Sequence, residues 1–141
     1  MSAAAAEKDR RRIVIVDDDR PTREMLQTAL ELEGYQTELA ANGLRLISIL
    51  HIDRPMLVIL DVMMSWIDGF ELCRSIKRNP ELRNIPIIFI SGKTDDLDVQ
   101  RGMDCGALDY FKKPLDVVRL LARIRAIADS DGTAVLPGGG E

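Results

Sequence analysis

The sequence has few of the residues that build disulfide scaffolds or zinc centres. It contains two cysteines and one histidine among 141 residues. Cys73 and Cys105 lack the short spacing of metal-ligand pairs, so we interpret them as reduced residues inside the fold. His51 is far in sequence from every acidic stretch and is interpreted as a surface residue near a helix end. These residues favour neither a zinc site nor a secreted, disulfide-stabilised domain.

The chain also lacks a basic excess and a long apolar run. Its formal net charge is -4 at pH 7, whereas nucleic-acid binding relies on a basic surface. No run is long enough to cross a bilayer, and the first residues lack the basic start and apolar centre of a secretory signal. We therefore expect a cytoplasmic protein with no membrane span and no direct nucleic-acid binding by this chain.

The composition predicts one globular domain with flexible ends. The hydrophobic fraction is 46%, which is sufficient for one core at this length. Residues 1–11 are rich in alanine and then charged, so we expect a flexible leader. The domain itself is predicted to cover residues 12–128, and the polar, then glycine-rich residues 129–141 to form a disordered tail.

Five apolar stretches alternate with five helical patterns. The predicted strands are residues 13–16, 35–40, 57–61, 85–90 and 108–111. Helix signals include Pro21 in a first turn, Thr94 as the cap of the fourth helix, and helical apolar spacing over residues 115–128. Continuous apolar strands alternating with helices predict an α/β fold. We expect a flavodoxin-like, doubly wound, five-stranded parallel sheet of order 2-1-3-4-5 with five helices.

Polar side chains follow four of the predicted strands. They are Asp17 and Asp18, Asp61, Ser91, and Lys113. The carboxyl ends of parallel strands lie at one edge of a sheet, and sites form where the strand order reverses, here between strands one and three. Three clustered carboxylates repel one another unless a cation is bound. Their hard oxygen atoms favour Mg²⁺, with Mn²⁺ as an alternative, so we predict a metal site at this edge.

Asp61 is the predicted acceptor of a phosphoryl group. An acyl phosphate would add about two negative charges and three acceptor oxygens. The Lys113 ammonium and the Ser91 hydroxyl are suitable partners for two of these oxygens, and the cation for a third. Motion of Ser91 and Lys113 toward the phosphoryl group would displace the loops after strands four and five. The fourth helix has little apolar surface to bury and is the expected mobile element.

These motifs resemble the receiver domain of two-component response regulators over about residues 12–128. The motifs that carry the resemblance are Asp17-Asp18, Asp61 with Asp68-Gly69, Ser91, and Lys113-Pro114. The resemblance implies that Asp61 is the phosphoacceptor, that Asp18 binds Mg²⁺ directly, and that Asp17 contributes through water. It further implies a metal ligand in the backbone carbonyl of Met63, and a switch formed by Ser91 and Tyr110.

The same resemblance implies a phosphorylation-activated signalling switch rather than an enzyme. The phosphoryl group would come from a sensor histidine kinase or a phosphotransfer protein, and hydrolysis would release it. Output to an unknown downstream protein would use the face formed by the fourth helix, fifth strand and fifth helix. The protein would be a monomer or a phosphorylation-dependent dimer, with Asp109 and Arg123 able to form an ion pair on that face, although Arg119 replaces a common acidic residue there.

Two neighbouring residues in the loop after Asp61 are unusual, one because it departs from the family pattern and the other because it is a tryptophan. Ser65 stands where the family usually has proline, and we expect this to loosen the loop after Asp61 without removing a ligand. Trp66, the single tryptophan, is expected beside the site, as a partner contact or folded onto its own domain.

Three other functions stay open. A phosphatase with an aspartyl nucleophile would need a second carboxylate two residues beyond Asp61, where this chain has Met63. A pseudo-receiver that binds partners without phosphorylation would not need the complete acidic set. A stand-alone receiver is expected, and the alternative is a fragment of a longer regulator with a DNA-binding or enzymatic output domain.

Overall fold

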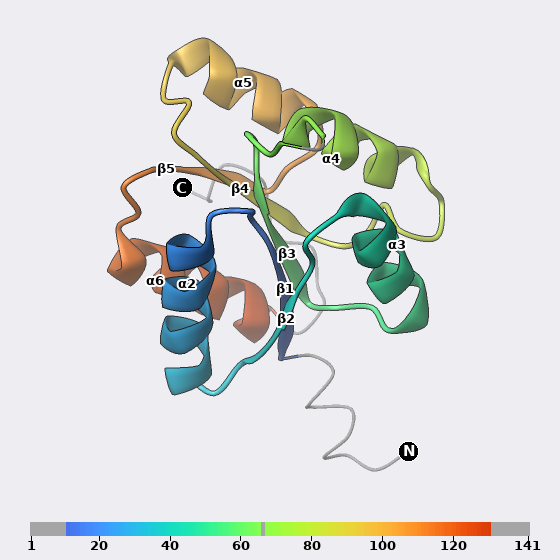
Figure 1. Ribbon diagram of the computed structural model, residues 1–141. Helices are drawn as coiled ribbons and strands as arrows, with labels where there is room; N and C mark the ends of the chain where they lie inside the picture. The colour runs from blue at the N-terminus through green and yellow to red at the C-terminus, as the bar shows by residue number, and fades with distance from the viewer. Residues whose placement is uncertain (1–10, 66, 131–141) are drawn as a thin grey trace.

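A computed structural model describes residues 11–65 and 67–130, which form one parallel sheet between two layers of helices (Figure 1). The sheet order is β2-β1-β3-β4-β5, and every strand pair is parallel. The strands are β1 (Arg12–Val16), β2 (Gln36–Leu39), β3 (Leu57–Asp61), β4 (Ile87–Ser91) and β5 (Asp109–Lys112). The predicted fold class and strand order are therefore confirmed.

Five helices connect and follow the strands in the described residues. They are α2 (Arg20–Leu32), α3 (Gly43–Ile52), α4 (Gly69–Arg78), α5 (Asp96–Asp104) and α6 (Val117–Asp129). Among these residues no helix combines the length and apolar character needed to cross a bilayer. Residues 1–10 of the predicted leader (1–11), the predicted position of Trp66, and residues 131–141 of the predicted tail (129–141) lie outside the described residues.

Alternating side chains of the central strands supply two separate cores. In β1, Ile13 and Ile15 pack with apolar residues of α2 and α6, whereas Val14 and Val16 pack with those of α3 and α4. The strands β1, β3 and β4 are buried along their whole length. Because successive strand residues point to opposite faces, a strand covered on both faces is apolar along its interior, as the sequence pattern predicted, and the polar residues Arg12, Asp61 and Ser91 stand at strand ends.

The boundaries differ from the predicted ones where hydrogen bonding decides them. Strand β4 begins at Ile87 rather than residue 85, because Pro86 has no amide hydrogen for the ladder. The prediction that Thr94 caps the fourth helix is wrong: α5 begins at Asp96 with Asp95 as its N-cap. Helix α6 begins at Val117 because the Asp116 side chain accepts from the Arg119 amide, and it ends one residue inside the predicted tail.

Helix α5 is the least buried helix of the described chain, as its sequence predicted. Its buried residue is Gly102, and Leu97 is 83% exposed. A Cβ at Gly102 would lie 2.9 Å from the Tyr110 ring, so the absence of a side chain there lets α5 approach β5 closely. The helix therefore rests on the sheet through a small contact, which suits an element that moves.

The two cysteines are buried and unpaired, in agreement with their interpretation as reduced core residues. Cys73 lies in α4 and Cys105 caps the end of α5. Burial raises the pKa of the Cys73 thiol to about 12, so it stays protonated and unreactive at neutral pH.

Candidate functional site

Three carboxylates meet at the carboxyl ends of β1 and β3. Asp17 and Asp18 directly follow β1, and Asp61 ends β3; Val16 pairs with Leu60 across the sheet. One carboxylate oxygen from each of the three residues lies within 4.8 Å of the others. Asp17 and Asp61 are buried, whereas Asp18 is exposed. This cluster, called the acidic cluster below, lies where the strand order reverses, as the topology rule predicts.

Lys113 bridges the two buried carboxylates of the acidic cluster. Its Nζ lies 3.0 Å from Oδ2 of Asp17 and 3.6 Å from Oδ2 of Asp61. Its amide donates to the Ser91 carbonyl at 2.7 Å, which fixes the start of this loop against the end of β4. Burial alone would lower the pKa of Lys113, but the hydrogen bond to Asp17 and the charges of Asp17 and Asp61 outweigh it, and the pKa is raised.

Asp61 carries an incompletely compensated charge. Burial, followed by the charge of Asp17, raises the pKa of Asp61 from 3.8 to about 6, although Lys113 and the Met63 amide oppose the shift. Oδ1 of Asp61 accepts from that amide at 3.2 Å. The carboxylate is therefore ionised at neutral pH but held at a cost, which a further cation would relieve.

The loop after β3 passes close to the end of its own strand. Gly69, the first residue of α4, donates its amide to the Val62 carbonyl at 2.8 Å. A Cβ at Gly69 would lie only 2.4 Å from the Asp61 carbonyl oxygen. Asp68 caps α4 by accepting from the Phe70 amide. The Asp68-Gly69 pair therefore closes the loop, in which Asp68 forms an antiparallel bridge with Met63.

Ser65 is tied to the acidic cluster by two hydrogen bonds. Its amide and its hydroxyl donate to the same atom, Oδ2 of Asp18, at 2.9 and 2.8 Å. The amide hydrogen bond is the main reason that the pKa of Asp18 is lowered. We expected serine in place of proline to loosen this loop, and the structure instead shows a serine that anchors it, because only a residue with an amide hydrogen and a hydroxyl can make both bonds.

Ser91 and Tyr110 lie on the neighbouring strands. Ser91 ends β4 one position beyond Ile90, the residue paired with Asp61, and its buried hydroxyl accepts from the Lys93 amide at 2.9 Å. The Tyr110 hydroxyl donates to the Lys93 carbonyl at 2.6 Å. Burial raises the pKa of Tyr110, and the nearby Ser91 hydroxyl opposes the shift. The two predicted switch residues therefore hold the same loop residue, Lys93, one through its amide and the other through its carbonyl.

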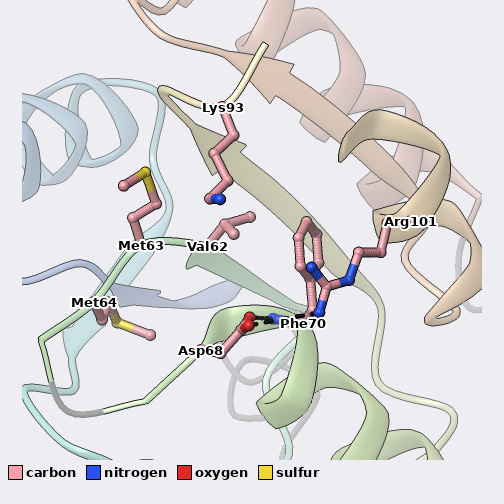
Figure 2. A pocket seen from close by; sticks show the side chains of 7 residues that line it. All are labelled: Val62, Met63, Met64, Asp68, Phe70, Lys93 and Arg101. Carbon is pink, nitrogen blue, oxygen red and sulfur yellow. Dashed lines mark hydrogen bonds and ion pairs between the residues drawn. The ribbon is translucent and has the colours of Figure 1, made fainter. Parts of the chain in front are cut away.

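A shallow pocket of about 370 Å³ lies beside these loops (Figure 2). Its walls come from the loop after β3, the start of α4, the loop after β4, and α5. The lining residues are Val62, Met63, Met64, Asp68, Phe70, Lys93 and Arg101. Arg101 covers the Phe70 ring at 4.7 Å from its centroid. The pocket therefore connects the predicted metal-binding loop to the predicted mobile helix.

Comparison with known proteins agrees with this geometry. The family model described as the response regulator receiver domain matches residues 13–125. The chain belongs to the response regulator receiver domain family. Response regulator MprA of Mycolicibacterium vanbaalenii is 40% identical over 116 residues, which are 82% of this chain and 49% of the relative. MprA of Mycobacterium avium is also 40% identical and is covered to 50%. The chain thus spans about half the length of these curated relatives.

Solved structures give the same assignment. The signal receiver domain of a signal transduction histidine kinase from Syntrophus aciditrophicus is 38% identical, with a TM-score of 0.78, over 88% of this chain and 94% of that one. A response regulator from Chloroflexus aurantiacus is 31% identical, with a TM-score of 0.79, over 85% and 98%. The chain is accordingly similar to receiver domains found both in regulators and in a kinase.

The acidic cluster of this receiver domain could hold a metal ion, and its carboxylate oxygens are the ligand type that Mg²⁺ prefers. Mg²⁺ prefers oxygen ligands about 2.0–2.1 Å away in an octahedral arrangement, so ligand oxygens around it lie about 3–4 Å apart. The cluster offers carboxylate oxygens within 4.8 Å of one another, and the charges of three acids exceed that of Lys113. The described residues near this cluster include no histidine or cysteine that would favour zinc.

Three features of the receiver site were missed from the sequence. The Ser65–Asp18 contact joins residues 47 positions apart, and no local pattern predicts it. Arg23, on α2, donates to the Asp17 carbonyl at 2.7 Å. Gly69 was noted only as part of a motif, although a glycine directly after an aspartate cap was a usable signal for close backbone approach.

Proposed function

We propose that this receiver domain is a signalling switch that accepts a phosphoryl group on Asp61. The donor would be the phosphohistidine of a sensor kinase or phosphotransfer protein, and the reaction would depend on Mg²⁺ or Mn²⁺. The observation that supports the proposal best is the convergence of Asp17, Asp18, Asp61 and the Lys113 ammonium at one edge of the sheet.

The chain's own residues suit this transfer. The Asp61 carboxylate would attack phosphorus while the imidazole nitrogen of the donor leaves, so the phosphorus exchanges its bond to nitrogen for one to oxygen. Lys113 Nζ, 3.6 Å from Oδ2 of Asp61, would pair with an oxygen of the incoming group. A divalent cation held by Asp17, Asp18, Asp61 and the Met63 carbonyl would neutralise charge on the phosphoryl oxygens.

Output would follow from the movement of Ser91 and Lys113 toward the phosphoryl group. Lys113 and Ser91 are already joined through the amide of one and the carbonyl of the other. Motion of Ser91 would release Lys93, which Tyr110 also holds. The effect would reach α5 and the face of α5, β5 and α6, where Asp109 and Arg123 form a 2.9 Å ion pair within the chain. A downstream protein or a second copy would bind this face.

A second candidate is a receiver module of a longer regulator. The supporting observation is that the chain spans only 49–50% of its curated relatives. In that case the same phosphorylation would control an attached output domain, which could bind DNA or act as an enzyme. For the receiver itself we propose no activity beyond its own phosphorylation and dephosphorylation, and a cytoplasmic location.

Incubation with Mg²⁺ and a small-molecule phosphodonor, followed by intact mass measurement, tests the proposal. We expect one added phosphoryl group in the wild type, and none for Asp61→Asn or after chelation of the metal. Asp96→Asn, at an exposed position on α5, is the matched control and should be phosphorylated like the wild type. Phosphoryl uptake that survives Asp61→Asn would refute Asp61 as the acceptor.

A further inference from the structure

The contact between Ser65 and Asp18 joins the two loops that surround the predicted metal site. Asp18 follows β1 and Ser65 follows β3, and the serine amide and hydroxyl both donate to Oδ2 of Asp18. The Ser65 loop also carries Met63, whose amide donates to Oδ1 of Asp61. One short loop therefore holds two of the three carboxylates in the acidic cluster.

Asp18 depends on this contact more than the other two acids depend on theirs. Asp17 is fully buried and is held by the Asp19 amide at 2.8 Å and by Lys113 at 3.0 Å. Asp61 is buried at the end of a strand. Asp18 is exposed, and both of the hydrogen bonds seen for its carboxylate come from Ser65. Packing alone would leave this side chain free to rotate into solvent.

We propose that Ser65 is a positioning residue that sets the affinity of the acidic cluster for a divalent cation. Both Ser65 donors occupy Oδ2 of Asp18, and the Asp18 carboxylate lies within 4.8 Å of a ligand oxygen of Asp17 and of Asp61, so its other oxygen, Oδ1, can serve as the metal ligand. A carboxylate that ligates a metal through one oxygen is ordinarily oriented by hydrogen bonds to the other, and loss of such an orienting partner typically weakens metal binding about 10–100-fold. The proposal rests on the proposed function in taking the cluster as the cation site.

The Ser65 donors could instead weaken cation binding, so the direction in which cation affinity changes when they are removed tests the proposal. If the Ser65 donors competed with the cation for Asp18, their removal would strengthen cation binding. Orientation predicts the reverse, because the freed carboxylate must give up rotational freedom when it binds the metal. Proline, the residue usual in the family at this position, has neither donor, so Ser65→Pro removes both bonds and Ser65→Ala removes only the hydroxyl.

Calorimetric titration with Mg²⁺ of the purified chain decides between the two. We expect Kd to rise at least three-fold in Ser65→Ala and about ten-fold in Ser65→Pro, whereas Ser65→Thr, which keeps both donors, should bind like the wild type. Ser75→Ala, at an exposed position on α4, is the matched control. Unchanged or tighter binding by Ser65→Ala would overturn the proposal, and this variant decides the test even if Ser65→Pro does not fold.

A second readout separates this inference from the proposed function. Phosphoryl uptake from a small-molecule donor is measured beside cation affinity in the wild type and in Ser65→Ala, and Ser75→Ala, outside the site, is the variant whose uptake should match the wild type. A wild-type chain that binds Mg²⁺ but takes up no phosphoryl group would refute the proposed function and leave the role of Ser65 intact. Normal phosphorylation with equal cation affinities in all variants would refute the role of Ser65 alone. Absence of Mg²⁺ binding by the wild type would refute both.

Discussion

The Lys113 ammonium lies 3.0 Å from Oδ2 of Asp17, a carboxylate with no exposed surface. The two residues are 96 positions apart in the chain, and they meet because β5 and β1 end at the same edge of the sheet. A buried carboxylate without a cation or donor is costly, so this contact is part of what stabilises the metal-free domain.

Replacement of Lys113 by methionine should destabilise the metal-free protein. The change removes the cation shared by Asp17 and Asp61 and leaves their repulsion uncompensated. We expect the free energy of unfolding to fall by about 1–3 kcal/mol in urea denaturation with chelator present. Lys112→Met, at the exposed neighbouring position, is the control and should change stability little. Equal stability of the two variants would mean that the ammonium does not stabilise the acids.

Asp61→Asn should raise the stability of the metal-free domain at neutral pH. The pKa of Asp61 is raised from 3.8 to about 6, so the folded state binds the proton more tightly than the unfolded state. Stability contributed by the protonated form is therefore lost as pH rises from about 4 to about 6, and the cost at pH 7 is about 3 kcal/mol. The uncharged side chain of the Asp61→Asn variant does not have to be ionised in a buried position, so this cost is absent.

Urea denaturation of metal-free wild type and Asp61→Asn at about pH 4 and pH 7 checks this. The variant should gain stability relative to the wild type at the higher pH and lose that advantage at the lower one. Asp96→Asn controls for the loss of one charge. A difference between the wild type and Asp61→Asn that is the same at both pH values would contradict the raised pKa.

The fold was predictable because its strongest signals are local. Continuous apolar runs such as Val14 to Val16 mark strands buried on both faces, and helical spacing marks the crossovers between them. The predicted ends of helices and strands were wrong where a single hydrogen bond determines the first or last residue of the element. Ser91 and Tyr110 both hydrogen-bond to Lys93 in the loop before α5, whose N-cap is Asp95 instead of Thr94, and neither contact can be inferred from propensity.

The site was predictable in part for a topological reason. Residues that end parallel strands must gather at one edge, so Asp61 and Lys113 could be placed together from the sequence. Ser65 could not, because the path of the loop from Asp61 to Asp68 depends on a close backbone approach at Gly69. A serine in a polar loop resembles any other solvent-exposed turn residue until that path is known.

Gly69→Ala should be strongly destabilising even though alanine is the better helix former. The new Cβ would lie 2.4 Å from the Asp61 carbonyl oxygen and 2.7 Å from Cα of Val62, and both are backbone atoms that cannot move aside cheaply. The gain in helix propensity is about 1 kcal/mol, so we expect a net loss of about 2 kcal/mol or more in unfolding free energy.

Gly92→Ala is the matched control for the glycine prediction. A Cβ at Gly92 meets no atom within 4 Å, so its unfolding free energy should stay within about 0.5 kcal/mol of the wild type. If Gly69→Ala and Gly92→Ala had the same denaturation midpoint, the close approach of α4 to the end of β3 would be wrong.

Tyr110→Phe should separate the acceptor chemistry from the response of α5. The Tyr110 hydroxyl holds the Lys93 carbonyl at 2.6 Å but is not a partner of Asp61, so phosphoryl uptake should stay within about two-fold of the wild type. Loss of one hydrogen bond costs about 0.5–1.5 kcal/mol, and that cost falls on the loop from Ser91 into α5. We therefore expect faster amide hydrogen exchange from Lys93 to Asp104 in the unphosphorylated variant.

The other tyrosine of the chain supplies the control. Tyr35 is buried at the opposite edge of the sheet, under the Arg11 guanidinium at 4.7 Å, and Tyr35→Phe should leave exchange in α5 unchanged. Because α5 buries so little of itself, its opening should respond to the loss of a single bond more than that of any strand. Exchange in α5 that is equally slow in the wild type and both variants would show that the Tyr110 hydroxyl does not restrain this helix.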